Sequence, residues 1–527
     1  MPGQDLDLHD PLDVFIVGGG INGCGIARDL AGRGYSVMLA ERDDLAEHTS
    51  SASTKLIHGG LRYLEYYEFS LVRKALQERE RLLRSAPHLM GPLRFVMPHD
   101  PATGRPAWMI RMGLFLYDHL AKREWLPGSG GVQLAGTELG APLRDNFQRG
   151  FVYSDGWVDD ARLVVANAQD ARAHGAQVLT RTAVTQARRE PSGWAITLQD
   201  GRVVRARVLV NAAGPWAERF LRDIAGEPPE RQLRLVKGSH IVVPMRFTHD
   251  HAYLFQNEDG RIIFAIPYQR DFTLIGTTDV ELPHQSPAPD KAAISAEEIA
   301  YLCAQASRYF REPVTANDVL WSYAGVRPLL DEAGGGSAAA ATRDYALEAH
   351  PGGAPLLTVW GGKITTFRKL AEDAAERVGE MLGEKRPAWT AEALLPGADL
   401  RAWIGAPQRP DHDFENFVAA LVRRYAAWPE PLLRRLAHAY GERITLVLME
   451  PGAEIAPGLR EGELRYLIEH EWARSAEDVL WRRSKLGLRF TAEQRAAVER
   501  WFAQAKAVPP GPEPGPAPAS ASQPLEG

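Results

Sequence analysis

An apolar run that breaks into a dense glycine loop, VFIVGGGINGCG at residues 14–25, constrains the fold of this chain more than any other segment. The run at 14–17 predicts a buried parallel strand. Gly18, Gly20 and Gly23 then give the spacing G-x-G-x-x-G. The first glycine permits a tight turn, the second lets backbone N–H groups approach a pyrophosphate, and the third lets the next helix pack closely. The loop therefore predicts a doubly wound α/β domain that binds a dinucleotide.

A second apolar run, SVMLAE at residues 36–41, ends on an acid about 20 residues after the loop. Glu41, at the tip of this predicted strand, can accept hydrogen bonds from both hydroxyls of a ribose. The helix that begins near Asn22 points its positive N-terminal end at the pyrophosphate. An acid at position 41, rather than an arginine, argues against a 2′-phosphate and therefore against NADP.

Composition narrows the class of protein. A chain of 527 residues should hold two or three domains, and its net charge of −6 gives no general affinity for nucleic acid. An anionic substrate would need a local cluster of cations. Cys24 and Cys303 are far apart in the sequence, which indicates a reducing compartment and predicts no disulfide scaffold and no metal site built from cysteines. We see no secretory signal and no stretch of about 18 apolar residues, so we expect a soluble or peripheral protein.

The pattern of the chain changes along its length. Short runs rich in Ile, Phe and Thr between about 233 and 330 predict an antiparallel sheet that caps the active site. Residues 356–378 then predict a strand, a glycine turn and a helix. Helical patterns alone follow from about 390, and the Pro/Gly/Ala/Ser-rich end of the chain predicts disorder.

One segment concentrates polar and basic groups directly after the second strand: SSASTKLIHGGLRYLEYYEFSLVRKALQERE at residues 50–80. A polar loop leading into a helix is the simplest interpretation. With this segment, the chain resembles the FAD-dependent, aerobic glycerol-3-phosphate dehydrogenases of the bacterial membrane-associated type. Further matching segments are GGGINGCGIARDLAGRG, YSDGWVDDARLVVANA, GPWA, KGSHIVVP, GVRPL, GGKITTFRKLAE and ELRYLIEHEWARSAEDVLWRRSKLG, and the likeness extends from residue 13 to about 490. The chain departs from the family at 212–214, where Ala-Ala-Gly replaces the more usual Ala-Thr-Gly.

The resemblance implies a Rossmann-like FAD-binding domain with an inserted antiparallel substrate-capping sheet, plus an all-α C-terminal domain. The expected divisions are an N-terminal extension at 1–12, an FAD-dependent oxidoreductase domain at 13–385 with the capping sheet at about 233–330, a helical domain at 386–507 and a disordered tail at 508–527. The resemblance also implies oxidation of sn-glycerol 3-phosphate to dihydroxyacetone phosphate, with electrons passed to a membrane quinone. Such a protein would be cytoplasmic and peripheral on the inner face of the cell membrane.

The cofactor contacts expected from the motifs lie on the two glycine turns and the serine segment between them. Gly361 and Gly362, between a strand and a helix, can bring backbone donors to the flavin edge where negative charge grows on reduction, although a simple turn is the alternative. The expected cofactor-binding residues are Gly18, Gly19, Gly20, Asn22, Gly23, Glu41, Ser50, Ser51, Ser53, Val184, Gly214, Gly361, Gly362 and Lys363.

The substrate phosphate carries a charge near −2, so at least two cations should converge on it. The motifs HGGLRY, GVRP and GGK offer Arg62, Arg327 and Lys363, and for each one a surface salt bridge is the alternative role. His240 is the first candidate for the base that takes the C2 hydroxyl proton. The other expected substrate contacts are His58, which is also the second candidate base, and Tyr63, for which simple packing is the alternative. Asp279 offers an orienting carboxylate, although the role of a turn or strand-end residue is the stronger interpretation.

A quinone acceptor requires contact with the membrane. Residues 105–128, RPAWMIRMGLFLYDHLAKREWLPG, suit an interfacial helix and equally suit a buried helix of the FAD domain. A basic C-terminal helix with Arg474, Arg482, Arg483 and Lys485 could supply electrostatic attachment, or a contact between two copies in a homodimer.

Three other functions remain open from the sequence. A glycerol-3-phosphate oxidase that reduces O₂ would share the same motifs. An amino-acid oxidase of the same fold is disfavoured, because a carboxylate needs fewer cations than a phosphate. A non-catalytic FAD-bound protein would show no bleaching of the flavin by substrate.

Overall fold

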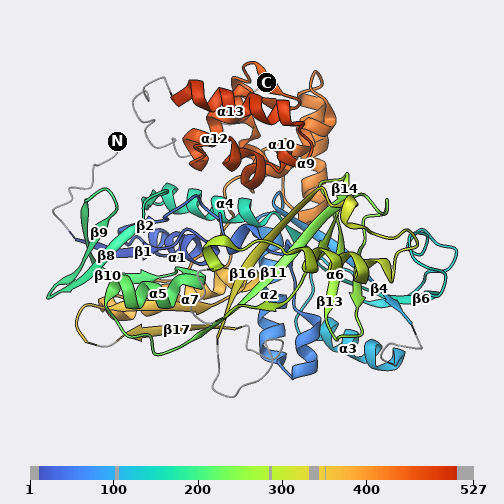
Figure 1. Cartoon of the computed structure of the whole chain (residues 1–527). Helices are drawn as coiled ribbons and strands as arrows, with labels where there is room; N and C mark the ends of the chain where they lie inside the picture. The colour runs from blue at the N-terminus through green and yellow to red at the C-terminus, as the bar shows by residue number, and fades with distance from the viewer. Residues whose placement is uncertain (1–10, 101–105, 284–287, 331–343, 351, 507–527) are drawn as a thin grey trace.

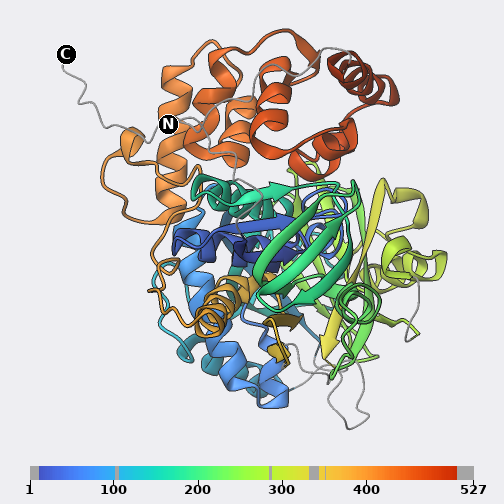
Figure 2. The same cartoon turned by 90° about the vertical axis from the view of Figure 1, so that its left-hand side faces the viewer.

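The computed structural model describes residues 11–100, 106–283, 288–330, 344–350 and 352–506. The predicted disorder of 508–527 lies outside these residues. Two sheets lie side by side, and a helical C-terminal domain covers one side of the pair (Figures 1 and 2).

The glycine loop belongs to an eight-stranded, mostly parallel sheet. Its strands are β1 (Leu12–Val17), β2 (Val37–Ala40), β7 (Gln177–Leu179), β8 (Val184–Glu190), β9 (Gly193–Leu198), β10 (Val203–Asn211), β17 (Tyr345–His350) and β18 (Leu356–Gly361). The order is β17-β18-β10-β1-β2-β7, with β9 paired to β10 and β8 paired to β9. Strand β1 pairs in parallel with both β2 and β10. The carboxyl ends of these strands therefore meet at one edge, where the loops bind ligands in such sheets.

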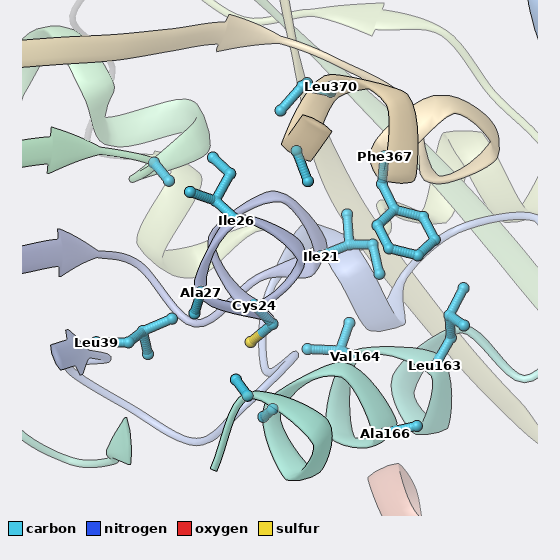
Figure 3. Packing of buried hydrophobic residues seen from close by; sticks show 14 of the residues in the cluster. Ile21, Cys24, Ile26, Ala27, Leu39, Leu163, Val164, Ala166, Phe367 and Leu370 are labelled. Carbon is cyan, nitrogen blue, oxygen red and sulfur yellow. The ribbon is translucent and has the colours of Figure 1, made fainter. Parts of the chain in front are cut away.

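Three helices cover one face of this sheet: α1 (Ile21–Gly32), α4 (Asp160–Ala173) and α7 (Phe367–Leu382). Helix α1 lies between the other two, with Val164 of α4 on one side and Phe367 of α7 on the other (Figure 3). Cys24 is fully buried in this layer, and burial raises the pKa of its thiol. This cysteine is a small core residue.

The second sheet has ten strands and is larger than expected. Its strands are β3 (Leu56–Ile57), β4 (Met90–His99), β5 (Gly130–Gln133), β6 (Arg149–Val158), β11 (Leu233–Pro244), β12 (Ala252–Gln256), β13 (Ile262–Tyr268), β14 (Phe272–Gly276), β15 (Val280–Glu281) and β16 (Trp321–Leu330). The antiparallel runs at 233–330 form, but the sheet is not confined to them. Strand β12 pairs in parallel with β4, and β4 pairs with β6, so the strands β3, β4, β5 and β6 extend the sheet beyond the predicted insertion.

The remaining helices flank the second sheet or build the C-terminal domain, except for the short helix α5 (Ala217–Arg219), which contacts β18 of the parallel sheet. They are α2 (Phe69–Ser85), α3 (Ala107–His119), α5 and α6 (Ala296–Ser307), then α8 (Arg401–Ile404), α9 (Pro410–Arg424), α10 (Glu430–Tyr440), α11 (Ile444–Met449), α12 (Glu461–Glu471) and α13 (Ala492–Lys506). The C-terminal domain also contains a small hairpin, β19 (Glu454–Ala456) and β20 (Leu459–Arg460), which the helical prediction missed.

Buried ion pairs join the C-terminal domain to the parallel sheet. Asp44, in the loop after β2, accepts from Arg482 Nε at 2.7 Å and from Arg483 Nη1 at 2.6 Å. Lys485 is also buried, with its Nζ 3.9 Å from Asp159 Oδ1. Arg482, Arg483 and Lys485 are enclosed between the domains, so these three cations cannot supply the predicted attachment to a membrane or to a second copy. Arg474, the fourth cation of that prediction, is exposed, and for it the attachment stays a prediction.

Candidate active site

A cavity of about 600 Å³ lies where the carboxyl edge of the parallel sheet faces the second sheet. Most of the residues predicted for the site line it, from both sheets. They are Gly18, Gly20, Asn22, Glu41, Ser50, Ser53, His58, Arg62, Tyr63, Val184, Gly214, His240, Asp279, Arg327, Gly361, Gly362 and Lys363. The predicted residues that do not line the cavity are Gly19, Gly23 and Ser51.

The glycine loop is shaped by close backbone contacts. Gly18 has φ of +111°, and a Cβ there would lie 2.5 Å from the carbonyl oxygen of Ala212. A Cβ on Gly23 would lie 1.9 Å from the carbonyl oxygen of Gly18. Gly23 therefore allows α1 to approach the loop, which is the role predicted for the third glycine.

The side chain of Glu41 holds the glycine loop by a hydrogen bond. Its carboxylate accepts the N–H of Gly19 at 2.6 Å and the N–H of Asp43 at 2.9 Å. Burial raises the pKa of this carboxyl against those two donors, which lower it. Asp43 is a second acid close to Glu41. Its Oδ2 lies 2.8 Å from His48 Nε2, so this carboxylate is paired with a side chain of the same loop.

The three serines of the following segment have different partners. Ser50 Oγ accepts the N–H of Ile21 at 3.0 Å and so closes the first turn of α1. Ser53 Oγ donates to Asp160 Oδ2 at 2.6 Å, and Lys55 Nζ contacts Asp160 Oδ1 at 2.8 Å. Ser51 Oγ donates to a carbonyl of its own turn. Ser50 and Ser53, which line the cavity, therefore bind neighbouring elements, whereas Ser51 stabilises its own turn.

The second glycine turn faces the first one across the cavity. Gly361 and Gly362 have φ of +70° and +94°, so both need the left-handed backbone. Asn22 Nδ2 donates to the carbonyl of Gly361 at 3.1 Å. The other amide atom, Asn22 Oδ1, is buried without a hydrogen-bond partner among the described residues. A buried acceptor of this kind at a cavity wall fits a bound molecule with a donor.

His240 is more enclosed than a catalytic base is expected to be. Its side chain is buried, stacks on Tyr323 at 4.8 Å between ring centroids, and places Nε2 3.0 Å from Thr54 Oγ1. Burial, with the charges of Lys55 and Arg327, lowers the pKa of His240 well below its usual value. The ring is therefore neutral but a weak base. His58 lines the same cavity, is only half-buried and has its backbone N–H bound by Thr365 Oγ1.

Three cations reach the cavity, as the motifs predict. Arg327 is held by Asp279 Oδ1 at 2.6 Å and by the carbonyl of Thr278 at 2.9 Å. Arg62 makes no ion pair with any described residue. Lys363 Nζ lies 3.8 Å from the centre of the Tyr63 ring. Asp279 is therefore an orienting carboxylate of the arginine.

Sequence reasoning missed a stacked pair in the wall of the cavity. The guanidinium of Arg42 lies 4.2 Å from the ring centre of Trp216, and both residues line the cavity wall. Trp216 Nε1 is buried with no acceptor in the described part of the chain. The GPWA motif contained the signal, but nothing in it shows which strand end the tryptophan would face.

Comparison with known proteins places these features in a family. Residues 13–368 match the model of the FAD dependent oxidoreductases, and residues 388–507 match the C-terminal domain of alpha-glycerophosphate oxidase. The chain is 51% identical over 507 residues to a glycerol-3-phosphate dehydrogenase of Pseudomonas aeruginosa, covering 94% of this chain and 96% of the relative. It is 48% identical over 510 residues to a D-erythritol 1-phosphate dehydrogenase of Brucella abortus, covering 94% and 98%.

A solved structure agrees over the same length. The glycerol-3-phosphate dehydrogenase of Bacillus halodurans, crystallised with FAD, superposes with a TM-score of 0.74 at 28% identity, covering 95% of this chain and 91% of that one.

Proposed function

Because this chain belongs to the family of FAD-dependent glycerol-3-phosphate dehydrogenases, we propose that it oxidises sn-glycerol 3-phosphate at C2 to dihydroxyacetone phosphate and passes the electrons to a membrane quinone. The observation that carries the proposal is the convergence of Arg62, Arg327 and Lys363 on the cavity that also contains the two glycine turns. A doubly charged phosphate and a flavin need these two sets of groups.

The residues of the cavity fit FAD. FAD supplies the hydride acceptor when it is bound. Gly18, Gly20 and Glu41 would hold its adenosine diphosphate end at the N-terminus of α1. The positive-φ pair Gly361 and Gly362 would present backbone N–H groups to the ring.

Arg327 and Arg62 would bind the phosphate in different ways. Arg327 is fixed in advance by Asp279 and Thr278, so little side-chain entropy is lost when it binds an anion. Arg62 has no ion pair with any described residue and is therefore available to a phosphate. Lys363 adds a third charge from the turn that would face the flavin.

The proton of the C2 hydroxyl needs an acceptor with a pKa near the working pH. His240 was the first candidate from the sequence, but its burial and the two neighbouring cations make it a weak base. We therefore assign the proton to His58. The assignment predicts that His58→Gln lowers kcat far more than His240→Gln does. A larger loss of kcat in His240→Gln than in His58→Gln would reverse it.

The experiment that tests the reaction uses the purified yellow holoenzyme without oxygen. Addition of sn-glycerol 3-phosphate should bleach the flavin absorbance rapidly, and glycine or D-alanine should not. No bleaching by the phosphate ester, with FAD bound and the protein folded, would refute the substrate assignment. Addition of a quinone analogue or of air to the bleached enzyme then distinguishes a dehydrogenase from an oxidase.

D-Erythritol 1-phosphate is the second candidate substrate, because a relative with that activity in its name is 48% identical over 94% of this chain. Both esters carry the same phosphate, so Arg327 and Arg62 cannot distinguish them. The ratio of kcat/KM for the two esters decides between them, and a higher value for the four-carbon ester would replace glycerol 3-phosphate as the substrate.

Helix α3 is the surface that we propose for peripheral contact with the membrane. Trp108, Met112 and Phe115 on its outer face are 64%, 51% and 55% exposed, whereas Leu114 on its inner face is buried. No helix in the described ranges is long and apolar enough to cross a bilayer. The double variant Trp108→Glu with Phe115→Glu should sediment less with anionic vesicles and keep its activity with a soluble dye. Undiminished sedimentation would exclude this face.

A further inference from the structure

The chain turns sharply between His58 and Arg62, where two glycines stand together. Gly60 has φ of +76°, and a Cβ on Gly59 would lie 2.6 Å from both Leu76 Cδ2 and Tyr117 Oη. Consecutive glycines have more accessible backbone conformations than other residues. Something outside the segment must therefore fix the directions in which His58 and Arg62 project into the cavity.

The Thr365 hydroxyl accepts the N–H of His58 at 3.3 Å, and the shorter external contact, the anchor on Gly59, comes from a hydroxyl of α3. The N–H of Gly59 donates to Tyr117 Oη at 2.8 Å, and Asp155 Oδ1 lies 3.3 Å from the same N–H. Tyr117 Oη donates in turn to the Asp155 carboxylate, with both oxygens at 2.8 Å. The Tyr117 hydroxyl thus accepts a hydrogen bond from the segment at residues 58–62 and donates one to Asp155 in the second sheet.

The anchor is itself rigidly held. Arg79 Nη1 of α2 contacts Asp155 Oδ1 at 2.7 Å, and the side chains of Arg79 and Asp155 are 1% and 2% exposed. Burial raises the pKa of Tyr117 well above its usual value, so the hydroxyl keeps its proton. Arg79 also pairs with Glu80 at 3.1 Å, and Glu80 accepts the N–H groups of the loop that follows α3. The loop after α3, the helix that carries Tyr117, is therefore also bound to α2.

We propose that Tyr117 is a positioning residue of the active site: its hydroxyl fixes the Gly59 N–H and so sets where His58 and Arg62 stand in the cavity. Tyr117 itself does not line the cavity, so it acts only through the segment. The inference rests on the proposed function for the roles of His58 and Arg62, whereas the anchoring of Gly59 does not depend on it. A displacement of about 1 Å in a positioned group can cost about a hundredfold in rate.

The test compares two buried tyrosines in the holoenzyme. Tyr117→Phe removes only the hydroxyl from the anchor. Tyr440→Phe is the matched control, because the Tyr440 hydroxyl donates to the buried carboxylate of Glu463 at 2.7 Å in the C-terminal domain. We expect Tyr117→Phe to raise KM for glycerol 3-phosphate and lower kcat, together about ten- to hundredfold in kcat/KM, with flavin content unchanged. The control should keep both constants.

A second measurement needs no substrate. Amide hydrogen exchange over residues 58–62 should become about tenfold faster in Tyr117→Phe and stay unchanged in Tyr440→Phe. If exchange at this segment is unchanged, the anchor is refuted whatever the reaction proves to be. If exchange rises but glycerol 3-phosphate never bleaches the flavin of the unmutated enzyme, the anchor stands and the proposed function fails. If Tyr117→Phe proves unstable, Asp155→Asn, which keeps an acceptor for the tyrosine, should show the same two changes to a smaller degree.

Discussion

Replacement of Arg327 by alanine tests the phosphate site most directly. Three of the five guanidinium N–H groups are committed, one to Asp279, one to the hydroxyl of Thr277 and one to the carbonyl of Thr278. The Nε–H and one Nη1–H remain for a ligand. Two hydrogen bonds to a charged phosphate are together worth roughly 2–4 kcal/mol after partial screening, since the side chain is 27% exposed.

That free energy corresponds to a loss of about 30- to 900-fold in kcat/KM for glycerol 3-phosphate. Most of the loss should fall on KM, because the phosphate does not change during the reaction and is bound equally in the ground and transition states. Part of the loss should come from Asp279, whose carboxylate would face the phosphate without its cation. The double variant Arg327→Ala with Asp279→Asn should therefore recover about tenfold.

The assay is steady-state reduction of a soluble dye over a range of glycerol 3-phosphate concentrations. Arg234→Ala is the matched control, because Arg234 pairs with Glu281 on the same sheet at 2.8 Å and does not line the cavity. Its kcat/KM should stay within about twofold of the unmutated enzyme. An unchanged kcat/KM in Arg327→Ala would remove the arginine from the site, and equal losses in both variants would show only a structural effect.

Three further outcomes follow from the geometry. Gly23→Ala should yield protein without FAD, because the new Cβ would lie 1.9 Å from the carbonyl of Gly18; a normal flavin spectrum would contradict this. Glu41→Gln should weaken FAD binding about tenfold, measured by flavin release, since the amide binds the N–H of Gly19 less strongly than the carboxylate does. Burial lowers the pKa of His88 from 6.5 to about 3, so the folded state keeps this ring neutral while the unfolded chain protonates it. Its contribution to stability is full above pH 6.5 and falls by about 2 kcal/mol at pH 5, which thermal melts of His88→Gln and the unmutated protein should reveal as a smaller pH dependence in the variant.

The glycine loop and its flanking strands could be predicted because all their signals are local. The run 14–17, the glycines and Glu41 lie within 28 residues, and the same short stretch builds β1, α1 and β2. Arg62, Arg327 and Lys363 could be selected in the same way, because the motifs HGGLRY, GVRP and GGK are short runs of adjacent residues.

The features that sequence reasoning missed depend on distant parts of the chain. Strand β4 contains Pro92 and Pro98, and prolines argue against a strand when only residue propensities are considered. Its pairing with β12 joins residues about 150 positions apart. His240 has a suitable pattern around it, but its burial against Tyr323 is set by the register of β11 with β16.

The distance along the chain between partners also bears on the order in which the protein is made. Asn22 donates to the carbonyl of Gly361, which lies 339 residues later in the chain. Asp44 accepts from Arg483, which lies 439 residues later. At 5–20 residues per second, about 20 to 90 s of translation separate Asp44 from its partner. The first glycine loop therefore leaves the ribosome long before the chain can complete the pocket around it. A chain terminated before residue 482 would lack both arginines that bind Asp44 and would expose a carboxylate that the finished protein encloses, so such a fragment is a natural target for quality control.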